Sequence, residues 1–295
     1  MSGDRIVVVG DVINDIVVVP RGEIRPDTDT ASTIRPRPGG SAANTAVWLG
    51  SLGAPVDFVG AVGLEDLENH ELVFQRAGVT PHLQIAADLP TGTIVILVDG
   101  ERRTMLTERG ANSALSSASV TDELLSNAAV LHISGYSILD GFGIPGARDL
   151  IDRTTAAGVP VSVTPGSSGY ITDFGVGPFL DAIAGTTVVF PNLAEGALLS
   201  GQTDPERIGR ALRERFEVVV LTMGAEGLIV FEGKTSTPVP APKIQHIVDP
   251  TGAGDALAAG FLDRWRTTRD AVQSAEAGVL IAARAIMLIG GRPPI

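Results

Sequence analysis

Short apolar runs rich in β-branched side chains recur along the whole chain. They stand at 6–9, 56–59, 94–98, 130–134, 159–163, 187–190, 218–222 and 228–231. Most of these runs are continuously apolar rather than alternating with polar residues, which is typical of strands buried on both faces of a parallel sheet. The pattern therefore predicts a mainly parallel central sheet.

Apolar residues with helical spacing fill several of the intervals between these runs. The clearest examples are 42–52, 65–77, 144–157 and 205–216. Glycine follows three of them, at Gly53, Gly78 and Gly158, where it can adopt the left-handed conformation that closes a helix. Strands and helices in alternation predict a three-layer α/β/α fold with right-handed crossovers. Since the sequence has no internal repeat or long linker, we expect one domain over residues 1–295.

The segments at about 16–38 and 91–108 depart from this alternation. The first is rich in Pro, Asp, Thr and Arg, and the second contains Asp99-Gly100 between two β-type runs, which is a hairpin signal. We expect both segments to form strands outside the main sheet, in a small sheet that covers a site as a lid. The alternative is a pair of edge hairpins that do not move.

The net charge of the chain indicates which classes of partner to expect. The formal net charge is −12 and only Lys234 and Lys243 are lysines, whereas proteins that follow nucleic-acid phosphates carry a basic face, so we expect no nucleic-acid partner. The absence of cysteine excludes disulfides, thiolate metal sites and a cysteine nucleophile. The sequence begins without a cationic region and no apolar run approaches about 18 residues, so we expect a soluble, cytoplasmic protein with no membrane contact.

The stretch DPTGAGD at 249–255 carries the strongest chemical signal. Gly252 and Gly254 permit close approach of the backbone, and a turn that opens directly into a helix aims free N–H groups at one point. Such a point favours an anion, for example a phosphoryl group in transfer. Asp255 then either caps the helix or takes a proton from an attacking hydroxyl, and the residues alone leave both roles open. The glycine spacing fits neither a Rossmann fingerprint nor a Walker A motif.

A second glycine turn lies near the start of the chain. Gly39 and Gly40 open a helix of small residues, and Asn44 in its first turn could offer its amide to a hydroxyl. Asp11 and Asp15 follow the first strand, where α/β folds bind ligands. The alternatives are a closely packed turn for the glycines and a solvated turn for the carboxylates.

Together the two turns resemble a known family. GGSAANTAVWLGSLG at 39–53 is similar to the N-terminal signature of the ribokinase-like (PfkB-type) carbohydrate kinases, and DPTGAGDALAAGFL at 249–262 is similar to their C-terminal signature. The resemblance covers nearly the whole chain. It implies a three-layer ribokinase-like fold with a β-sheet lid, and ATP-dependent transfer of a phosphoryl group to a hydroxyl of a small sugar.

The resemblance also implies roles for individual residues. Substrate binding falls to Asp15, Gly39, Gly40 and Asn44, and the anion hole to Gly252, Ala253 and Gly254, with Asp255 as catalytic base. The ATP side falls to Asn112, Thr222, Gly224 and Gly227, together with Asn192 and Glu195 of an N-x-x-E motif that organises Mg²⁺ through water. Asp249 and Thr251 would help to hold a monovalent cation such as K⁺.

The sequence departs from the family pattern beside the acceptor. After 60–63 the usual Asp-containing element is replaced by LEDLENHE, and Thr164-Pro165 stands where many members carry Asp. No residue of 275–288 could be assigned to the adenine. These departures leave the acceptor and part of the nucleotide site open.

Several alternatives therefore remain. A nucleoside kinase would need an aromatic slot, but aromatic residues are only 4% of the chain and the lid segments have none, which favours a free sugar. A sugar phosphate stays open because Arg35, Arg37, Arg102 and Arg103 lie in the lid. A non-catalytic sensor on the same fold is a different class. The lid sheet could also pair across a two-fold axis to form a homodimer.

Overall fold

The computed structural model describes residues 3–99 and 102–294. The strands are β1 (Arg5–Val9), β2 (Ile13–Pro20), β3 (Ser32–Gly39), β4 (Val56–Gly63), β5 (Val79–Ala86), β6 (Gly92–Asp99), β7 (Arg102–Glu108), β8 (Ala128–Ser134), β9 (Val161–Thr164), β10 (Val188–Val189), β11 (Val218–Thr222), β12 (Leu228–Glu232) and β13 (Thr235–Val239). The helices are α1 (Ser41–Ser51), α2 (Leu67–Arg76), α3 (Asp122–Ser126), α4 (Gly135–Ser137), α5 (Gly143–Ala156), α6 (Ser168–Phe174), α7 (Val176–Ala182), α8 (Leu193–Ser200), α9 (Pro205–Arg213), α10 (Ala253–Thr268) and α11 (Ala271–Ala285).

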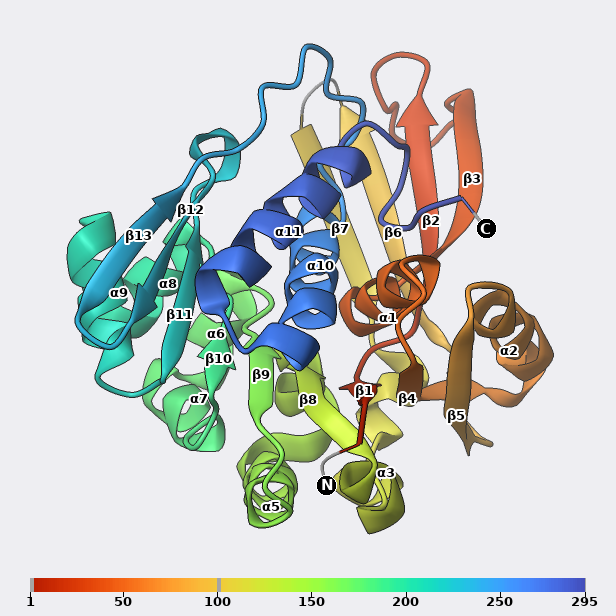
Figure 1. The fold of residues 1–295 in the computed structure, drawn as a ribbon. Coiled ribbons are helices and arrows are strands. Elements are labelled where there is room, and N and C mark those ends of the chain that lie inside the picture. Colours follow the sequence, from red (N-terminus) through yellow and green to blue (C-terminus); the bar gives the residue numbers. More distant parts are fainter. Residues whose placement is uncertain (1–2, 100–101, 295) are drawn as a thin grey trace.

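The described residues form a large central sheet in the order β13-β12-β11-β10-β9-β8-β1-β4-β5 (Figure 1). From β11 to β5 every neighbouring pair is parallel, whereas β12 pairs antiparallel with both β11 and β13, so among the described strands of this sheet β12 alone runs in the opposite direction. The mainly parallel sheet expected from the continuous apolar runs is therefore confirmed. The central strands β1, β4 and β8 are buried almost throughout, because helices cover both faces of the sheet.

Each face of the sheet has its own apolar core. One core contains side chains of α1, α10 and α11, and the other contains side chains of α5, α7 and α9. This arrangement confirms the predicted three-layer α/β/α fold. The predicted glycine C-caps are also present, since Gly53, Gly78 and Gly158 have φ values of 81°, 77° and 72°.

The second sheet is small and has the strand order β3-β2-β6-β7. It comes from the two segments that were expected to lie outside the main sheet, but β2 begins at Ile13, earlier than the predicted boundary at 16. Strand β2 pairs with β3 from Ile13 opposite Gly39 onward, so Asp15 of the GDVIND stretch lies in the sheet, whereas Asp11 precedes it. Strands β6 and β7 pair antiparallel as a hairpin requires, although residues 100–101 of its turn lie outside the described residues.

Strand β5 was not predicted, and its sequence explains why. It alternates irregularly between exposed and buried positions and contains Pro81, which cannot donate to a ladder. Because β5 lies at the edge of the central sheet, it pairs only with β4 and tolerates that proline. The local pattern of apolar residues therefore does not predict this strand, which forms by pairing with β4.

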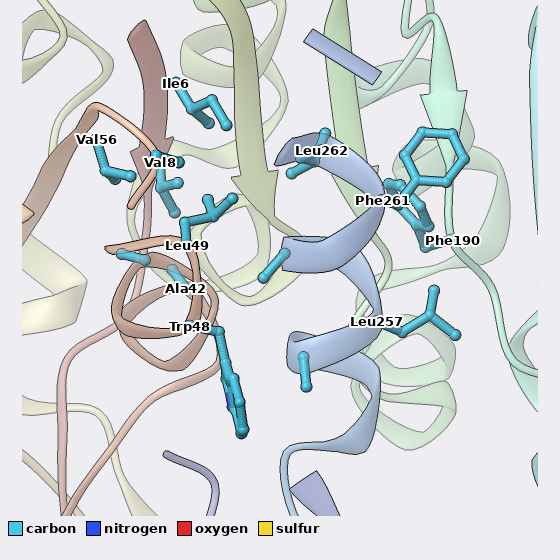
Figure 2. Packing of buried hydrophobic residues seen from close by; sticks show 14 of the residues in the cluster. Ile6, Val8, Ala42, Trp48, Leu49, Val56, Phe190, Leu257, Phe261 and Leu262 are labelled. Atoms are coloured by element: carbon cyan, nitrogen blue, oxygen red, sulfur yellow. The ribbon is translucent and has the colours of Figure 1, made fainter. Parts of the chain in front are cut away.

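Helices α1 and α10 lie side by side over β1 and β8, with Ala42, Trp48, Leu49, Leu257 and Phe261 in the core around them (Figure 2). These are the two helices that begin at the glycine turns singled out in the sequence. Their packing therefore brings the two turns together at one end of the sheet. None of the helices in the described part of the chain is long and apolar enough to cross a membrane.

Candidate active site

A cavity of about 450 Å³ lies between the ends of the central strands and the second sheet. The core lines it with residues that follow parallel strands, among them Asp11, Tyr136, Thr164, Asn192 and Thr222. The second sheet lines it with Asp15, Ile94, Ile96, Met105 and Thr107. Carboxyl ends of parallel strands are where α/β folds bind ligands, so the cavity is the candidate active site.

Asp255 lies in the first turn of α10, on the wall of this cavity, and does not cap its own helix. Its two carboxylate oxygens instead accept hydrogen bonds from α1: the Ser41 hydroxyl donates to Oδ1 at 2.7 Å and the Asn44 amide to Oδ2 at 2.9 Å. Both donors also lie in a first helical turn, so the two glycine turns fix Asp255 between them. The sequence left open that Asp255 caps its helix, and in this structure it does not have that role.

The backbone beside Asp255 presents free donors. Within the described residues, the N–H groups of Gly252, Gly254 and Asp255 make no hydrogen bond to protein, and that of Ala253 makes only a long one of 3.3 Å to Pro250. Gly252 has φ of 77°, and a Cβ there would lie 2.5 Å from the backbone of Gly291. The turn therefore needs glycine at this position, and it leaves amides unpaired at the positive end of a helix, as an anion site requires.

Burial raises the pKa of Asp255 and Asp15 in the cavity. Desolvation raises the pKa of Asp255 to about 7, although the hydrogen bonds from Asn44 and Ser41 oppose it. Desolvation raises the pKa of Asp15 to about 6, against the lowering effect of the positive charge of Arg292. A carboxyl group poised near neutral pH is suited to accept and release a proton.

Arg292 is a site residue that the sequence did not reveal. Its buried guanidinium donates from Nε to Asn44 Oδ1 at 2.9 Å and from Nη2 to Gly39 O at 2.6 Å, while Nη1 has no hydrogen-bond partner among the described residues. Desolvation lowers the pKa of Arg292 to about 10, so it remains a cation at neutral pH. It therefore holds Asn44 from the side opposite Asp255.

Contacts of the neighbouring Gly291 position Arg292 beside Asn44. The indole of Trp48 donates to Gly291 O at 2.9 Å, and Gly291 lies so close to the Asn44 amide that a Cβ there would be 2.5 Å from Nδ2. The only local signal was the glycine pair before Arg292, which by itself predicts a turn and no function.

Asp11 stabilises the start of α1 rather than facing outward. Its carboxylate accepts hydrogen bonds from the N–H groups of Ser41 at 2.7 Å and Ala42 at 3.2 Å. It also adds negative charge that raises the pKa of Asp15 and Asp255. Asp11 is thus neither a solvated turn residue nor free to hold a substrate with both oxygens.

Asn192 and Glu195 form a capping box at the start of α8. Asn192 Oδ1 accepts from the N–H of Glu195 at 2.9 Å, and Glu195 Oε2 accepts from the N–H of Asn192 at 3.0 Å. Within the described residues no protein group donates to Glu195 Oε1, and both residues line the cavity. Desolvation raises the pKa of Glu195 to about 7, opposed by its bonds with Asn192.

This arrangement fits Mg²⁺ that keeps its water ligands. The part of the chain described by the structure holds no group of three or more His, Asp or Glu residues that could bind a metal directly. Mg²⁺ usually keeps several waters and takes only one or two carboxylates from a protein, and Glu195 Oε1 at the cavity wall could contact such an ion.

A second cavity of about 490 Å³ adjoins the first, since Thr222, Gly254 and Leu257 line both. Its walls are mostly apolar. They include the predicted nucleotide residues Gly224 and Gly227, and also Ala225, Ile244, Ile247, Val279, Ala282, Ala283 and Ile286. The α11 residues that the sequence could not assign thus face this cavity. The glycine turn lies between a cavity that carries several charged and polar side chains and a mostly apolar one, so it has room for a phosphate with an acceptor on one side and a nucleobase on the other.

Asn112 and Gly39 lie behind the walls of both cavities instead of lining them. The Asn112 side chain accepts from the N–H of Val12 and donates to Val12 O, both at 2.9 Å, so it ties the loop after β1 to the Gly110–Ala114 turn. Gly39 has no room for a side chain, since a Cβ would lie 2.2 Å from Asp15 Oδ2. Their place is to support Asp15 and the loop that precedes it.

The replaced segment after 60–63 also returns to the site. Asp66 accepts a hydrogen bond from the Asn14 amide at 3.0 Å, and Nε2 of His70 lies 3.1 Å from Asn14 Oδ1. Desolvation lowers the pKa of His70 to about 4, so its ring is neutral at physiological pH. These two residues hold β2 at Asn14, the residue next to Asp15.

Asp249 and Thr251 do not fit a monovalent cation here. The guanidinium of Arg103, from β7, pairs with Asp249 Oδ1 at 2.9 Å and donates to Thr251 Oγ1 at 2.7 Å. The other Asp249 oxygen accepts from the N–H of Gly290 at 3.0 Å. The side-chain oxygens that were expected to bind the ion already have protein partners.

Three aromatic side chains, among them Phe190, reach the first cavity from outside the second sheet. Tyr136 and Tyr170 line it, and the Arg109 guanidinium lies 4.2 Å from the ring centre of Tyr170 and 5.2 Å from that of Tyr136. Arg109 also pairs with Asp140 at 2.9 Å. The absence of aromatic residues from the lid segments therefore does not make the cavity free of them.

Comparisons with known proteins show which sequences and folds this chain resembles. The model of the pfkB family carbohydrate kinase matches residues 4–295. An ATP-dependent ribose-1-phosphate kinase of Halopiger xanaduensis is 30% identical over 95% of this chain and 92% of its own length. An uncharacterized sugar kinase of Archaeoglobus fulgidus is 27% identical over 83% of this chain and 96% of its own. The crystal structure of an adenosine kinase from Sinorhizobium meliloti is 25% identical, covers 100% of this chain and 97% of its own, and superposes with a TM-score of 0.87.

Proposed function

The chain belongs to the pfkB family of carbohydrate kinases, and on that premise we propose that it transfers the terminal phosphoryl group of ATP to a hydroxyl of a small sugar, with Asp255 as the base. The observation that carries the proposal is the start of α10. There a carboxylate of raised pKa and unpaired backbone amides share one wall of a cavity.

The acceptor binds on the side of the lid. Asp15 can accept hydrogen bonds from two sugar hydroxyls, and Gly40 lines the same cavity. Asn44 acts differently from the first expectation, because its amide already donates to Asp255 and its oxygen accepts from Arg292. It orients the base, and any contact with the sugar is secondary.

Transfer then depends on position and charge rather than on covalent catalysis. Asp255 removes the proton of the attacking hydroxyl, while the N–H groups of Gly252 and Gly254 stabilise charge on the transferred group. Mg²⁺, held through water by Glu195 and Asn192, would neutralise charge on the triphosphate when bound. The adenine fits the apolar cavity beside α11.

A nucleoside is the second candidate acceptor, and a specific observation favours it. Tyr136 and Tyr170 provide aromatic surface in the first cavity, and Ile94, Ile96 and Met105 provide an apolar wall opposite the core. A base stacks on such surfaces, whereas a free sugar gains little from them. The named adenosine kinase shares the fold at 25% identity, which leaves the acceptor class to experiment.

The second sheet supports a homodimer. Alternate residues of each strand point to opposite faces of a sheet. Since the residues of β2, β6 and β7 that line the cavity alternate along each strand, the residues between them face away from it. That outer face carries exposed Ile34 and Leu106, which are 55% and 57% accessible, with partly exposed Ile16, Val95 and Leu97 beside them. An apolar sheet face of this kind can pair with its own copy across a two-fold axis.

The test is formation of ADP from ATP across a panel of free sugars, nucleosides and sugar phosphates. We expect turnover with one class and little with the others, and Asp255→Asn should lower kcat by about 10²-fold or more while ATP binding is retained. Asp255→Asn with more than about a tenth of the wild-type rate would refute the base assignment. If no acceptor supports ADP formation, a sensor on this scaffold becomes the better account.

A further inference from the structure

A lid arginine occupies the place where a monovalent cation was expected. Arg103 lies on β7, and its guanidinium reaches the loop just ahead of α10, 148 residues further along the chain. One nitrogen lies 2.9 Å from Asp249 Oδ1 and the other donates to Thr251 Oγ1 at 2.7 Å. The side chain is largely covered, with 29% of its surface accessible, and that of Asp249 with 15%.

We propose that the Arg103 guanidinium provides the fixed positive charge beside the anion-hole turn, so that this protein needs no monovalent cation there. The proposal rests on the proposed kinase activity for its catalytic consequence, but the placement of the charge is independent of it.

The shape of the contact suits a guanidinium better than an alkali-metal ion. A guanidinium is planar and permanently charged, and its two nitrogens match one carboxylate oxygen and one hydroxyl in a fixed fork. K⁺ would need several oxygen ligands at once. Asp249 Oδ1 already receives the Thr251 N–H at 2.9 Å as well as Arg103, and Oδ2 receives the Gly290 N–H. A second cation placed among these groups would be repelled by Arg103.

The same contact ties the lid to the site of phosphoryl transfer. Thr251 immediately precedes Gly252, whose N–H opens the anion hole, and the N–H of Asp249 is bonded to Ile286 O in the segment after α11. Arg103 therefore joins three parts of the molecule: the lid strand β7, the turn before α10 and the C-terminal segment. Because Arg103 lies on β7, the position of this charge depends on the position of the second sheet over the cavity.

The experiment compares K⁺ with tetramethylammonium, which is too large to enter such a site, at constant ionic strength so that screening is equal. For the wild-type protein we expect both the melting temperature and the rate of ADP formation to be the same in the two salts, within about twofold in rate. For Arg103→Ala we expect a rate about tenfold lower in tetramethylammonium, the scale of one lost charge-assisted hydrogen bond, with recovery of rate and melting temperature when K⁺ or guanidinium is added.

Two further variants make the result specific. Arg103→Lys keeps a charge without the fork and should stay independent of K⁺ at an intermediate rate. Arg21→Ala removes an exposed arginine after β2 in the same sheet and should behave as wild type in both salts.

A wild-type protein whose melting temperature or rate rises with K⁺ would overturn the proposal. So would an Arg103→Ala variant that matches the wild type in every salt, because the charge would then have no role. If Arg103→Ala does not fold, the wild-type and Arg103→Lys arms still decide the question. Absence of turnover with every acceptor would count against the kinase function, whereas the melting temperatures would still test the cation site.

Discussion

At the level of single residues, the charged groups of the candidate site are held in place by hydrogen bonds to neutral and to oppositely charged side chains. Asp255 receives hydrogen bonds from Ser41 and Asn44, and Asn44 is in turn held by Arg292. Substitution of Asn44 would therefore disturb the base as well as any contact with the acceptor. This chain of contacts explains how a carboxylate can stay oriented toward the cavity while burial keeps its pKa near neutral.

The raised pKa of Asp255 predicts a dependence of rate on pH. A base must be deprotonated to act, so kcat/KM should rise with pH through about 7 and level off above it. An ordinary aspartate would place the inflection near about 4. Initial rates from pH about 5 to 9 at saturating ATP check this, and the residual rate of Asp255→Asn should lack the inflection. A profile that is flat above pH about 5 would contradict the prediction.

Loss of the Arg292 charge should shift that profile. Arg292→Met removes a positive charge that lowers the pKa of Asp15 and Asp255, so the inflection should move to higher pH. The variant also leaves Asn44 Oδ1 and Gly39 O without a donor, which should reduce the free energy of unfolding by about 2–4 kcal/mol. Rate profiles and chemical unfolding measure the two effects.

A matched control for that variant is available on α10. Arg266→Met breaks an ion pair with Asp263 in the last turn of the helix and should leave the inflection unchanged. An inflection for Arg292→Met that is unchanged or moves to lower pH would show that Arg292 does not act on the carboxylates through its charge.

At the level of elements, the site depends on how two helices begin. Helices α1 and α10 both start after glycines with positive φ, Gly40 at 97° and Gly252 at 77°. Small residues along both helices let them approach closely, which brings Thr45 Oγ1 within 3.4 Å of Asp255 O. The two helix starts therefore form one rigid unit, and the two sequence signatures are its two halves.

Gly252→Ala should disrupt that unit. The residue adopts a left-handed φ, and its new Cβ would lie 2.5 Å from the backbone of Gly291, so we expect a loss of about 1–3 kcal/mol in unfolding free energy. The companion variant Gly254→Ala places its Cβ in open space at a helical φ and should keep full stability. Both should lower kcat, because both alter the anion hole. Equal stability of the two variants in chemical unfolding would contradict this account.

At the level of the whole molecule, the second sheet has two faces with different tasks. One face lines the cavity with Ile94, Ile96 and Met105, and the other exposes apolar residues to solvent. The same sheet carries Arg103 to the loop before α10. The proposed acceptor contact, the proposed charge beside the phosphate and the proposed self-association thus all involve this one sheet.

Self-association through that outer face is open to a direct test. We expect the wild-type protein to have the mass of two chains in sedimentation or light scattering, and Leu106→Glu to have the mass of one, because a charge buried in an apolar interface is costly. Leu72→Glu, which changes an exposed leucine on α2, should leave the mass at two chains. A wild-type protein that stays monomeric as its concentration rises would contradict the dimer.

The fold could be predicted from the sequence in most of its elements. Continuous apolar runs indicated buried parallel strands, and glycines after helical runs marked helix ends, because both signals depend only on neighbouring residues. Strand β5 was missed since its membership in the sheet comes from β4 and not from its own alternation. The small sheet was anticipated, whereas its start at Ile13 was not.

The candidate site could be predicted only in part, because most of its contacts join residues that are far apart in the sequence. The pattern of residues indicated which turns bear chemistry, because glycine, small residues and a carboxylate at a helix start limit what a backbone can do. The partners of those residues lie far away in the chain: Asn44 bonds Asp255 at a separation of 211 residues and Arg292 at 248. Contacts of that range exist only after α1, α10 and the C-terminal segment have packed on the sheet, and no local periodicity encodes them. For the same reason, a cation site expected at Asp249 and Thr251 turned out to hold the side chain of Arg103.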